Sequence, residues 1–310
     1  MMIVRMNTKL MLIHLTAVGL LFPEFILAAV PACPPAGYDI AALHDLRQRH
    51  FGIADPVKRQ TLARNLLPCL GVPDAIVRDR IAYEAYATWR QNKSLDAATW
   101  QFVERSLLAS LDAGRPDPDG VTKPFALLVL AEAVKADRAV PYLSDEERRA
   151  LLKAAASYLI ELRDYRGFDS DVGWRHGAAH AADLLAQLAL SAAFGKVEMD
   201  RILAAVAAQI VPADAHFYVY GESERFAAVV AAVASRGVYS AGEWNIWLLK
   251  LINPAPFVKW DEAYWSQMGL AKRHDTAYFL LALYAQTSVD EHSAVSQLAP
   301  LIVKAMQPLG

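Results

Sequence analysis

The sequence predicts an all-α protein made of antiparallel helix pairs, stacked as a HEAT-like solenoid or as an α/α toroid. Apolar residues recur at helical spacing through most of the chain, and 55% of its 310 residues are hydrophobic. The high alanine and leucine content favours helix intrinsically. No segment alternates apolar and polar residues over a useful length with the period of two that strands require.

The helical segments follow one another with short connections. Asp55 and Pro56 provide an N-cap and a first-turn proline, and Ser144 with Glu147 forms a capping box. The segment 121–136 is almost entirely apolar, which predicts a helix buried on most sides. The predicted helices cover residues 57–70, 74–91, 94–111, 121–136, 144–162, 173–193, 197–211, 222–236, 242–252, 271–286 and 291–307.

Composition excludes several classes of protein. Lys and Arg number 31 against 33 Asp and Glu, which gives a net charge of −2. A general nucleic-acid binder needs a basic surface, so no nucleic-acid partner is expected. The length and hydrophobic content allow a full core, which excludes a disordered chain or a disulfide-dense miniprotein.

Residues 1–29 have the three parts of a secretory signal peptide. Arg5 and Lys9 precede an apolar run over residues 10–22, and small residues follow at Ala28 and Ala29. The apolar run is shorter than the roughly 20 residues of a spanning helix. We therefore expect export to the periplasm or the medium, no transmembrane segment after cleavage, and a single helical domain over residues 30–310.

The two cysteines allow two interpretations. In an oxidising compartment Cys33 and Cys69 are expected to pair in a disulfide. Alternatively, Val30–Pro31–Ala32–Cys33 is a degenerate lipobox, and Cys33 carries a lipid. The two interpretations exclude each other, because a lipidated Cys33 leaves Cys69 without a partner.

One helical segment, 173–193, has a polar face of unusual composition. His176, His180, Asp183 and Gln187 fall within a stripe about 60° wide, at 100° per residue. A solvated face normally carries Lys and Glu, and here small residues flank the stripe instead. The stripe is therefore expected to line a groove or a polar seam between helices.

Three roles compete for this stripe. His176, His180 and Asp183 supply the ligand types of a zinc site, although the pattern lacks the glutamate of zinc proteases. Alternatively, Asp183 orients His180 as a general base for a hydrolysis. In the third interpretation the side chains hydrogen-bond across helices, with arginines such as Arg166 or Arg225, and fix the packing.

Six motifs resemble, in order, those of the bacterial domain-of-unknown-function family numbered 2785. They are Arg78–Asp79, Phe125–Ala–Leu–Leu–Val–Leu–Ala131, Asp164–Tyr–Arg–Gly167, Gly173–Trp–Arg–His176, Ala179–His–Ala–Ala–Asp183 and Glu222–Ser–Glu–Arg225. The resemblance extends from about residue 71 to residue 284 and implies an α-helical, HEAT-like fold without supplying an activity. Its signature falls on Asp164, Arg166, Gly167, Gly173, Trp174, His176, His180, Asp183, Glu224 and Arg225. Arg175, between the tryptophan and the histidine, departs from the pattern.

Three functional hypotheses follow, of which the third is an inhibitor or immunity-like partner of another exported protein. The first is a binding or scaffolding protein of the bacterial cell envelope, with a protein, peptide or glycan as its ligand. The second is a hydrolase, metal-dependent in one version, that uses His176, His180 and Asp183 in a helical cavity. The first hypothesis assigns the surrounding polar cluster, Asp164, Arg166, Trp174, Gln187, Glu224 and Arg225, to binding or to structure. The sequence requires no cofactor. The metal-dependent version of the second hypothesis would use zinc.

Overall fold

The computed structural model describes residues 32–112, 114–288 and 294–309. The contacts within the chain separate residues 1–30 from residues 31–310, and the predicted signal peptide lies outside the described residues. No helix in the described ranges is long and apolar enough to cross a membrane.

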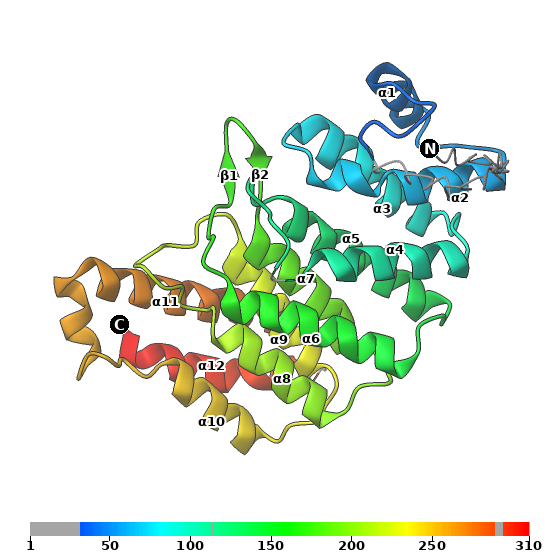
Figure 1. Cartoon of the computed structure of the whole chain (residues 1–310). Coiled ribbons are helices and arrows are strands. Elements are labelled where there is room, and N and C mark those ends of the chain that lie inside the picture. Colours follow the sequence, from blue (N-terminus) through cyan, green and yellow to red (C-terminus); the bar gives the residue numbers. More distant parts are fainter. Residues whose placement is uncertain (1–31, 113, 289–293, 310) are drawn as a thin grey trace, which may run out of the picture. The chain divides into compact units, whose positions relative to one another are not determined.

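The fold is all-α, as predicted, and the helices follow the predicted segments closely (Figure 1). The α-helices are α1 (Ile40–Gln48), α2 (Pro56–Asn65), α3 (Glu84–Gln91), α4 (Ala97–Ser110), α5 (Thr122–Ala139), α6 (Asp145–Glu161), α7 (Gly177–Ala189), α8 (Lys196–Ala207), α9 (Glu222–Ala234), α10 (Ala241–Leu251), α11 (Gln267–Thr287) and α12 (Ala299–Met306). Helix α1 was not predicted. Of the predicted segment 291–307, residues 291–293 lie outside the described part, and the remainder contains α12.

The local sequence explains where the helices begin. Asp55 accepts hydrogen bonds from the N–H groups of Val57 and Lys58, with Pro56 in the first turn of α2. Ser144 and Glu147 form the predicted capping box of α6. The predicted helix 74–91 is less regular, because a π-helical stretch (Ile76–Tyr83) precedes α3.

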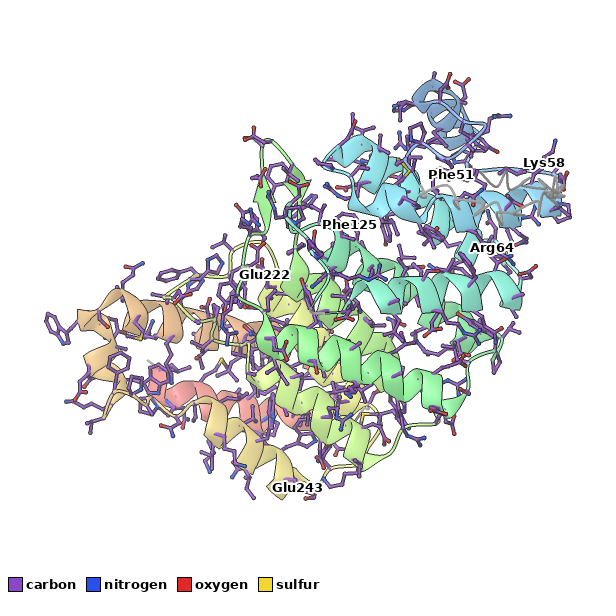
Figure 2. The ribbon with its side chains drawn as sticks, in the orientation of Figure 1. Phe51, Lys58, Arg64, Phe125, Glu222 and Glu243 are labelled. Carbon is purple, nitrogen blue, oxygen red and sulfur yellow. A yellow bond between two sulfur atoms is a disulfide. The ribbon has the colours of Figure 1, made fainter. Side chains whose placement is uncertain are left out.

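Helices α5, α7, α9 and α11 pack successively against one another and form the centre of the described structure. Helices α4 and α3 pack on α5, while α6 and α8 pack on each other and on α7. Phe125 of α5 and Glu222 of α9, both labelled in Figure 2, are buried. Side chains of α5 are buried over almost its whole length, as its apolar composition predicts. The solenoid or toroid arrangement stays a prediction.

Cys33 and Cys69 form a disulfide, which is the first of the two interpretations of the cysteines. Cys69 belongs to a short 3₁₀-helix (Leu67–Gly71) and is fully buried. The bond therefore attaches the beginning of the described chain to the core beside α2.

One acidic side chain of the core, that of Glu104, has no hydrogen-bond partner among the described residues. Glu104 of α4 is buried, and neither of its carboxylate oxygens has a hydrogen-bond partner among the described residues. Burial, aided by the negative charge of Glu147, raises the pKa of Glu104 to about 7. Between pH 4.5 and 7 the unfolded chain loses this proton before the folded chain does, so the carboxyl lowers stability as the pH rises.

We therefore expect Glu104→Met to stabilise the protein, by about 2 to 3 kcal/mol at pH 8 and by much less near pH 4.5. Urea unfolding at both pH values measures the difference in the free energy of unfolding. Glu146→Met, at an exposed position of α6, is the control and leaves the pH dependence unchanged. An equal gain at both pH values would contradict the explanation.

Candidate functional site

The most specific part of the sequence pattern folds into a hairpin followed by a helix. Strands β1 (Phe168–Asp169) and β2 (Gly173–Trp174) pair antiparallel, with Phe168 opposite Trp174. The predicted helix start near residue 173 is wrong, because α7 begins at Gly177. Gly173 and His176 have positive φ, and the N–H groups of Arg175 and His176 donate to the carbonyls of Gly167 and Arg166. The backbone just before residue 177 therefore belongs to the hairpin and not to the helix.

Three residues of the predicted polar stripe bind groups on neighbouring helices. The carbonyl of Pro124 accepts a hydrogen bond from His180 Nδ1 at 3.2 Å. Arg225 Nη1 of α9 lies 2.6 Å from Asp183 Oδ1, and Arg138 Nη1 of α5 donates to Gln187 Oε1 at 2.7 Å. The side chains thus connect α7 to the helix on either side of it, as the packing interpretation predicts.

The fourth residue, His176, lies just before the helix and contacts a different group. Its Nε2 is 3.5 Å from Oε1 of Glu222, the buried first residue of α9. Burial opposes ionisation of Glu222, but His176 and backbone N–H groups outweigh it, so the pKa of Glu222 lies below its usual value. Glu222 therefore holds a negative charge against the imidazole.

These contacts bear on two of the interpretations. His176, His180 and Asp183 turn towards different partners, which gives no support to a shared metal site. No group of three or more His, Cys, Asp or Glu in the described ranges is placed to hold a metal ion. Asp183 binds Arg225 and His180 binds a carbonyl, so the contacts give no support to the Asp183–His180 acid–base pair either. Burial, followed by the charge of His176, lowers the pKa of His180 to about 3, so its imidazole is neutral at pH 7.

The rest of the predicted polar cluster separates into pairs. Arg166 binds Asp164 instead of the stripe, with Nε 2.7 Å from Oδ1. Glu224 accepts a hydrogen bond from the hydroxyl of Tyr278 on α11. Trp174 lies on the hairpin, where solvent reaches it.

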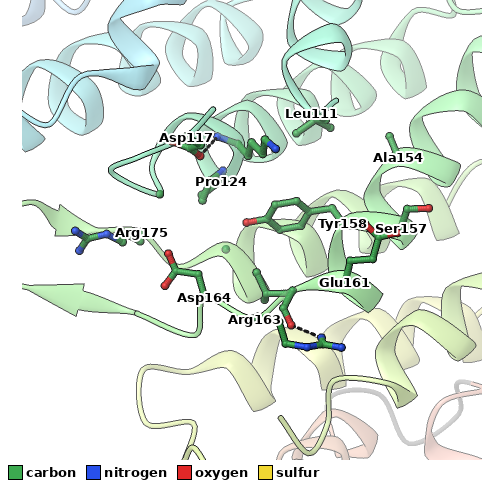
Figure 3. Close-up of a pocket in the computed structure, with 14 residues that line it drawn as sticks. Leu111, Asp117, Pro124, Ala154, Ser157, Tyr158, Glu161, Arg163, Asp164 and Arg175 are labelled. Atoms are coloured by element: carbon green, nitrogen blue, oxygen red, sulfur yellow. Dashed lines mark hydrogen bonds between the residues drawn. The ribbon is translucent and has the colours of Figure 1, made fainter. Parts of the chain in front are cut away.

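A pocket of about 450 Å³ lies beside this segment, between the α5 N-terminus, the last turns of α6 and the start of α7 (Figure 3). Asp164, Arg175 and Gly177 of the 164–183 segment form one wall. The other lining residues are Leu111, Asp117, Gly120, Lys123, Pro124, Ala154, Ser157, Tyr158, Glu161, Leu162 and Arg163.

Hydrogen bonds and an ion pair hold the charged side chains of the pocket wall in place. Asp117 accepts hydrogen bonds from the N–H groups of residues 121–123 and so caps α5. Arg175 is buried, donates to the carbonyl of Asp119 at 2.7 Å and pairs with Asp169. In Figure 3 the ring of Tyr158 lies across the pocket, between the Asp117 loop and Asp164. Burial and these two carboxylates raise the pKa of Tyr158, so its hydroxyl stays protonated and able to donate.

Close packing requires glycine at the start of α7. A Cβ atom on Gly177 would lie 2.4 Å from the hydroxyl of Tyr158. The small residue lets the helix terminus approach the pocket and leaves room for the phenol. Sequence reasoning missed Tyr158 and Lys123, because nothing in their local pattern shows that they face the 164–183 segment.

Sequence reasoning also missed two buried carboxyl groups. Glu222 precedes the predicted Glu224 by two residues, and the structure buries Glu222 instead. Asp275 of α11 is fully buried, where one oxygen accepts from the N–H of Tyr218 at 3.0 Å and the other has no partner among the described residues. Burial raises the pKa of Asp275 to about 7. Apolar periodicity alone does not reveal such groups.

A family model described as "Protein of unknown function (DUF2785)" matches residues 107–285. The chain belongs to this family. The DUF2785 match contains the hairpin, α7 and every residue that lines the pocket. It does not include Arg78 and Asp79, the first of the motifs on which the resemblance was based. No curated protein and no solved structure matches the chain.

The contacts of α7 predict unequal effects for its two arginine partners. Arg225→Met leaves the partly buried carboxylate of Asp183 unpaired and is expected to lower the free energy of unfolding by about 1 to 3 kcal/mol. Arg138→Met is the matched control, because it removes a hydrogen bond to a neutral amide and should cost about 0.5 kcal/mol. Denaturant unfolding at pH 7 measures both variants. Equal losses would show that the Asp183–Arg225 pair has no special role in packing.

Proposed function

We propose that the protein is an exported binding protein of the bacterial cell envelope, and that its ligand occupies the pocket beside α7. The observation that carries this proposal is the position of the 164–183 segment. Three of its residues, Asp164, Arg175 and Gly177, form a wall of the pocket, while its His/His/Asp stripe is used for packing. The contacts of that stripe give no support to a hydrolase built on it.

The lining of the pocket favours a small zwitterionic ligand, such as a free amino acid or the end of a peptide. Lys123, Arg163 and Arg175 provide positive charge, and Asp117, Glu161 and Asp164 provide negative charge. A ligand with one charge of each sign satisfies such a surface better than a purely anionic or cationic one. Tyr158 adds a neutral hydroxyl that donates or accepts a hydrogen bond.

Two further features support the proposal that the protein is exported. Residues 1–29 have the pattern of a signal peptide. The disulfide between Cys33 and Cys69 supports the same compartment, because such bonds persist in oxidising surroundings and are rare in the cytosol. It also argues against a lipid on Cys33.

Ligand binding is tested by ligand-observed NMR with a panel of free amino acids, dipeptides and tripeptides. At least one of them is expected to bind the wild-type protein. Ala154→Phe should weaken its binding at least about tenfold, because the added ring fills part of the pocket.

Lys153→Met is the control for this experiment. It changes an exposed residue next to Ala154 that does not line the pocket. Circular dichroism establishes that both variants are folded. The proposal fails if no zwitterion binds, or if a folded Ala154→Phe variant binds as tightly as the wild type.

Export is tested separately by expressing the full chain in a Gram-negative host. We expect periplasmic protein that begins at Val30, with no free thiol. Leu12→Arg places a charge in the apolar run and should leave the chain uncleaved in the cytoplasm. A mature protein that begins at a lipidated Cys33 would contradict both the cleavage site and the disulfide.

A further inference from the structure

Three aromatic side chains from separate segments gather on one surface, which we call the aromatic platform. They are Phe168 of β1, Trp174 of β2 and Tyr220 of the loop before α9. Solvent reaches 48%, 38% and 41% of their surfaces, respectively. The ring centroid of Trp174 is 5.2 Å from that of Phe168 and 5.8 Å from that of Tyr220. None of the three lines the pocket beside α7.

The hairpin fixes two of these rings. Phe168 and Trp174 are directly opposite each other in the antiparallel pair, so both side chains stand on the same face of the hairpin. Behind the hairpin, the buried guanidinium of Arg78 donates to the carbonyls of Val172 and Trp174, at 2.8 and 3.2 Å. The backbone that carries the rings is therefore held by hydrogen bonds from the core.

The third ring and the base of the platform are also fixed. Trp174 stacks on His176, with 4.9 Å between the centroids and 28° between the planes, and His176 in turn faces the buried Glu222. Glu222 also accepts a hydrogen bond from the N–H of Tyr220, at 2.9 Å. A Cβ atom on Gly167 would overlap the ring of Tyr220, at 2.1 Å. The glycine thus permits that ring to lie directly against the backbone.

An arrangement of this kind differs from scattered surface hydrophobic residues. Single exposed apolar residues are ordinary, but a rigid group of three rings presents a preorganised apolar surface to water. The group is too small for a stable protein interface, which covers about 800 Å² on each partner. Its dimensions suit a ligand of one or two rings.

We propose that the aromatic platform binds a pyranose ring of a glycan. The C–H bonds of a pyranose gather on a flat apolar face, which matches the electron-rich face of an aromatic ring. Its hydroxyls point outward and need polar partners. Ser170 and Asp171 are exposed in the turn that joins the two strands, two residues after Phe168 and three residues before Trp174, respectively. The platform and this turn together provide both kinds of contact.

The experiment is isothermal titration of the mature protein with chitotetraose and with cellotetraose. At least one of them is expected to bind. Trp174→Ala should weaken that binding about 30-fold, as expected for an aromatic residue at the centre of an interface. Phe168→Ala, a change at a more exposed ring, should weaken it as well and provides a second variant if Trp174→Ala does not fold.

Trp265→Ala is the matched control, because Trp265 is 87% exposed and lies outside the platform. Its affinity for the sugars should equal that of the wild type. The proposal is overturned if neither oligosaccharide binds, if Trp265→Ala loses as much affinity as the platform variants, or if a proline-rich peptide binds the platform and the sugars do not. Because the test uses sugars, its result is independent of zwitterion binding in the pocket.

Discussion

The buried guanidinium of Arg78 is the interaction on which the described structure around the hairpin depends. Its nitrogens donate to four backbone carbonyls, those of Val72 and Pro73 nearby and those of Val172 and Trp174 across the chain. Its Nε lies 2.8 Å from Asp79, and its charge lies 4.6 Å from the centre of the Phe125 ring. A buried charge is tolerated only when it is paired and hydrogen-bonded in this way.

Through these hydrogen bonds the side chain of Arg78 supports both the pocket beside α7 and the aromatic platform. The hairpin presents Phe168 and Trp174 on one face, while Arg175, next in sequence to Trp174, reaches the Asp119 loop at the pocket. Arg78 binds the backbone carbonyls of Val172 and Trp174. It therefore supports both the pocket wall and the aromatic platform. That support lies outside the region that the family model covers.

Much of the fold followed from the sequence, because helices are determined largely by local patterns. The capping box at Ser144 and the Asp55–Pro56 pair located helix starts correctly. The hairpin escaped prediction, because each strand has two residues and its geometry depends on positive φ at Gly173 and His176. His176 is not a glycine, so its neighbours in the folded structure must stabilise its positive φ. The spacing of apolar residues along the sequence does not describe those neighbours.

The candidate site was predicted in part, for a related reason. The spacing of His180, Asp183 and Gln187 correctly placed them on one face, and Arg225 was correctly proposed as a partner. The direction of each side chain depends on residues far away in sequence, such as Pro124 and Arg138. The pocket unites a loop, the end of α6 and the start of α7, so Tyr158 and Lys123 carry no local signal of their role.

The contact between Gly167 and the Tyr220 ring has a consequence for the evolution of the family. The two positions are 53 residues apart in the sequence, yet any side chain at 167 would displace the ring at 220. Substitutions at these positions should therefore occur together across relatives, with a larger residue at 167 accompanied by a smaller one at 220. Such covariation would trace which branches of the family retain the same surface beside the hairpin.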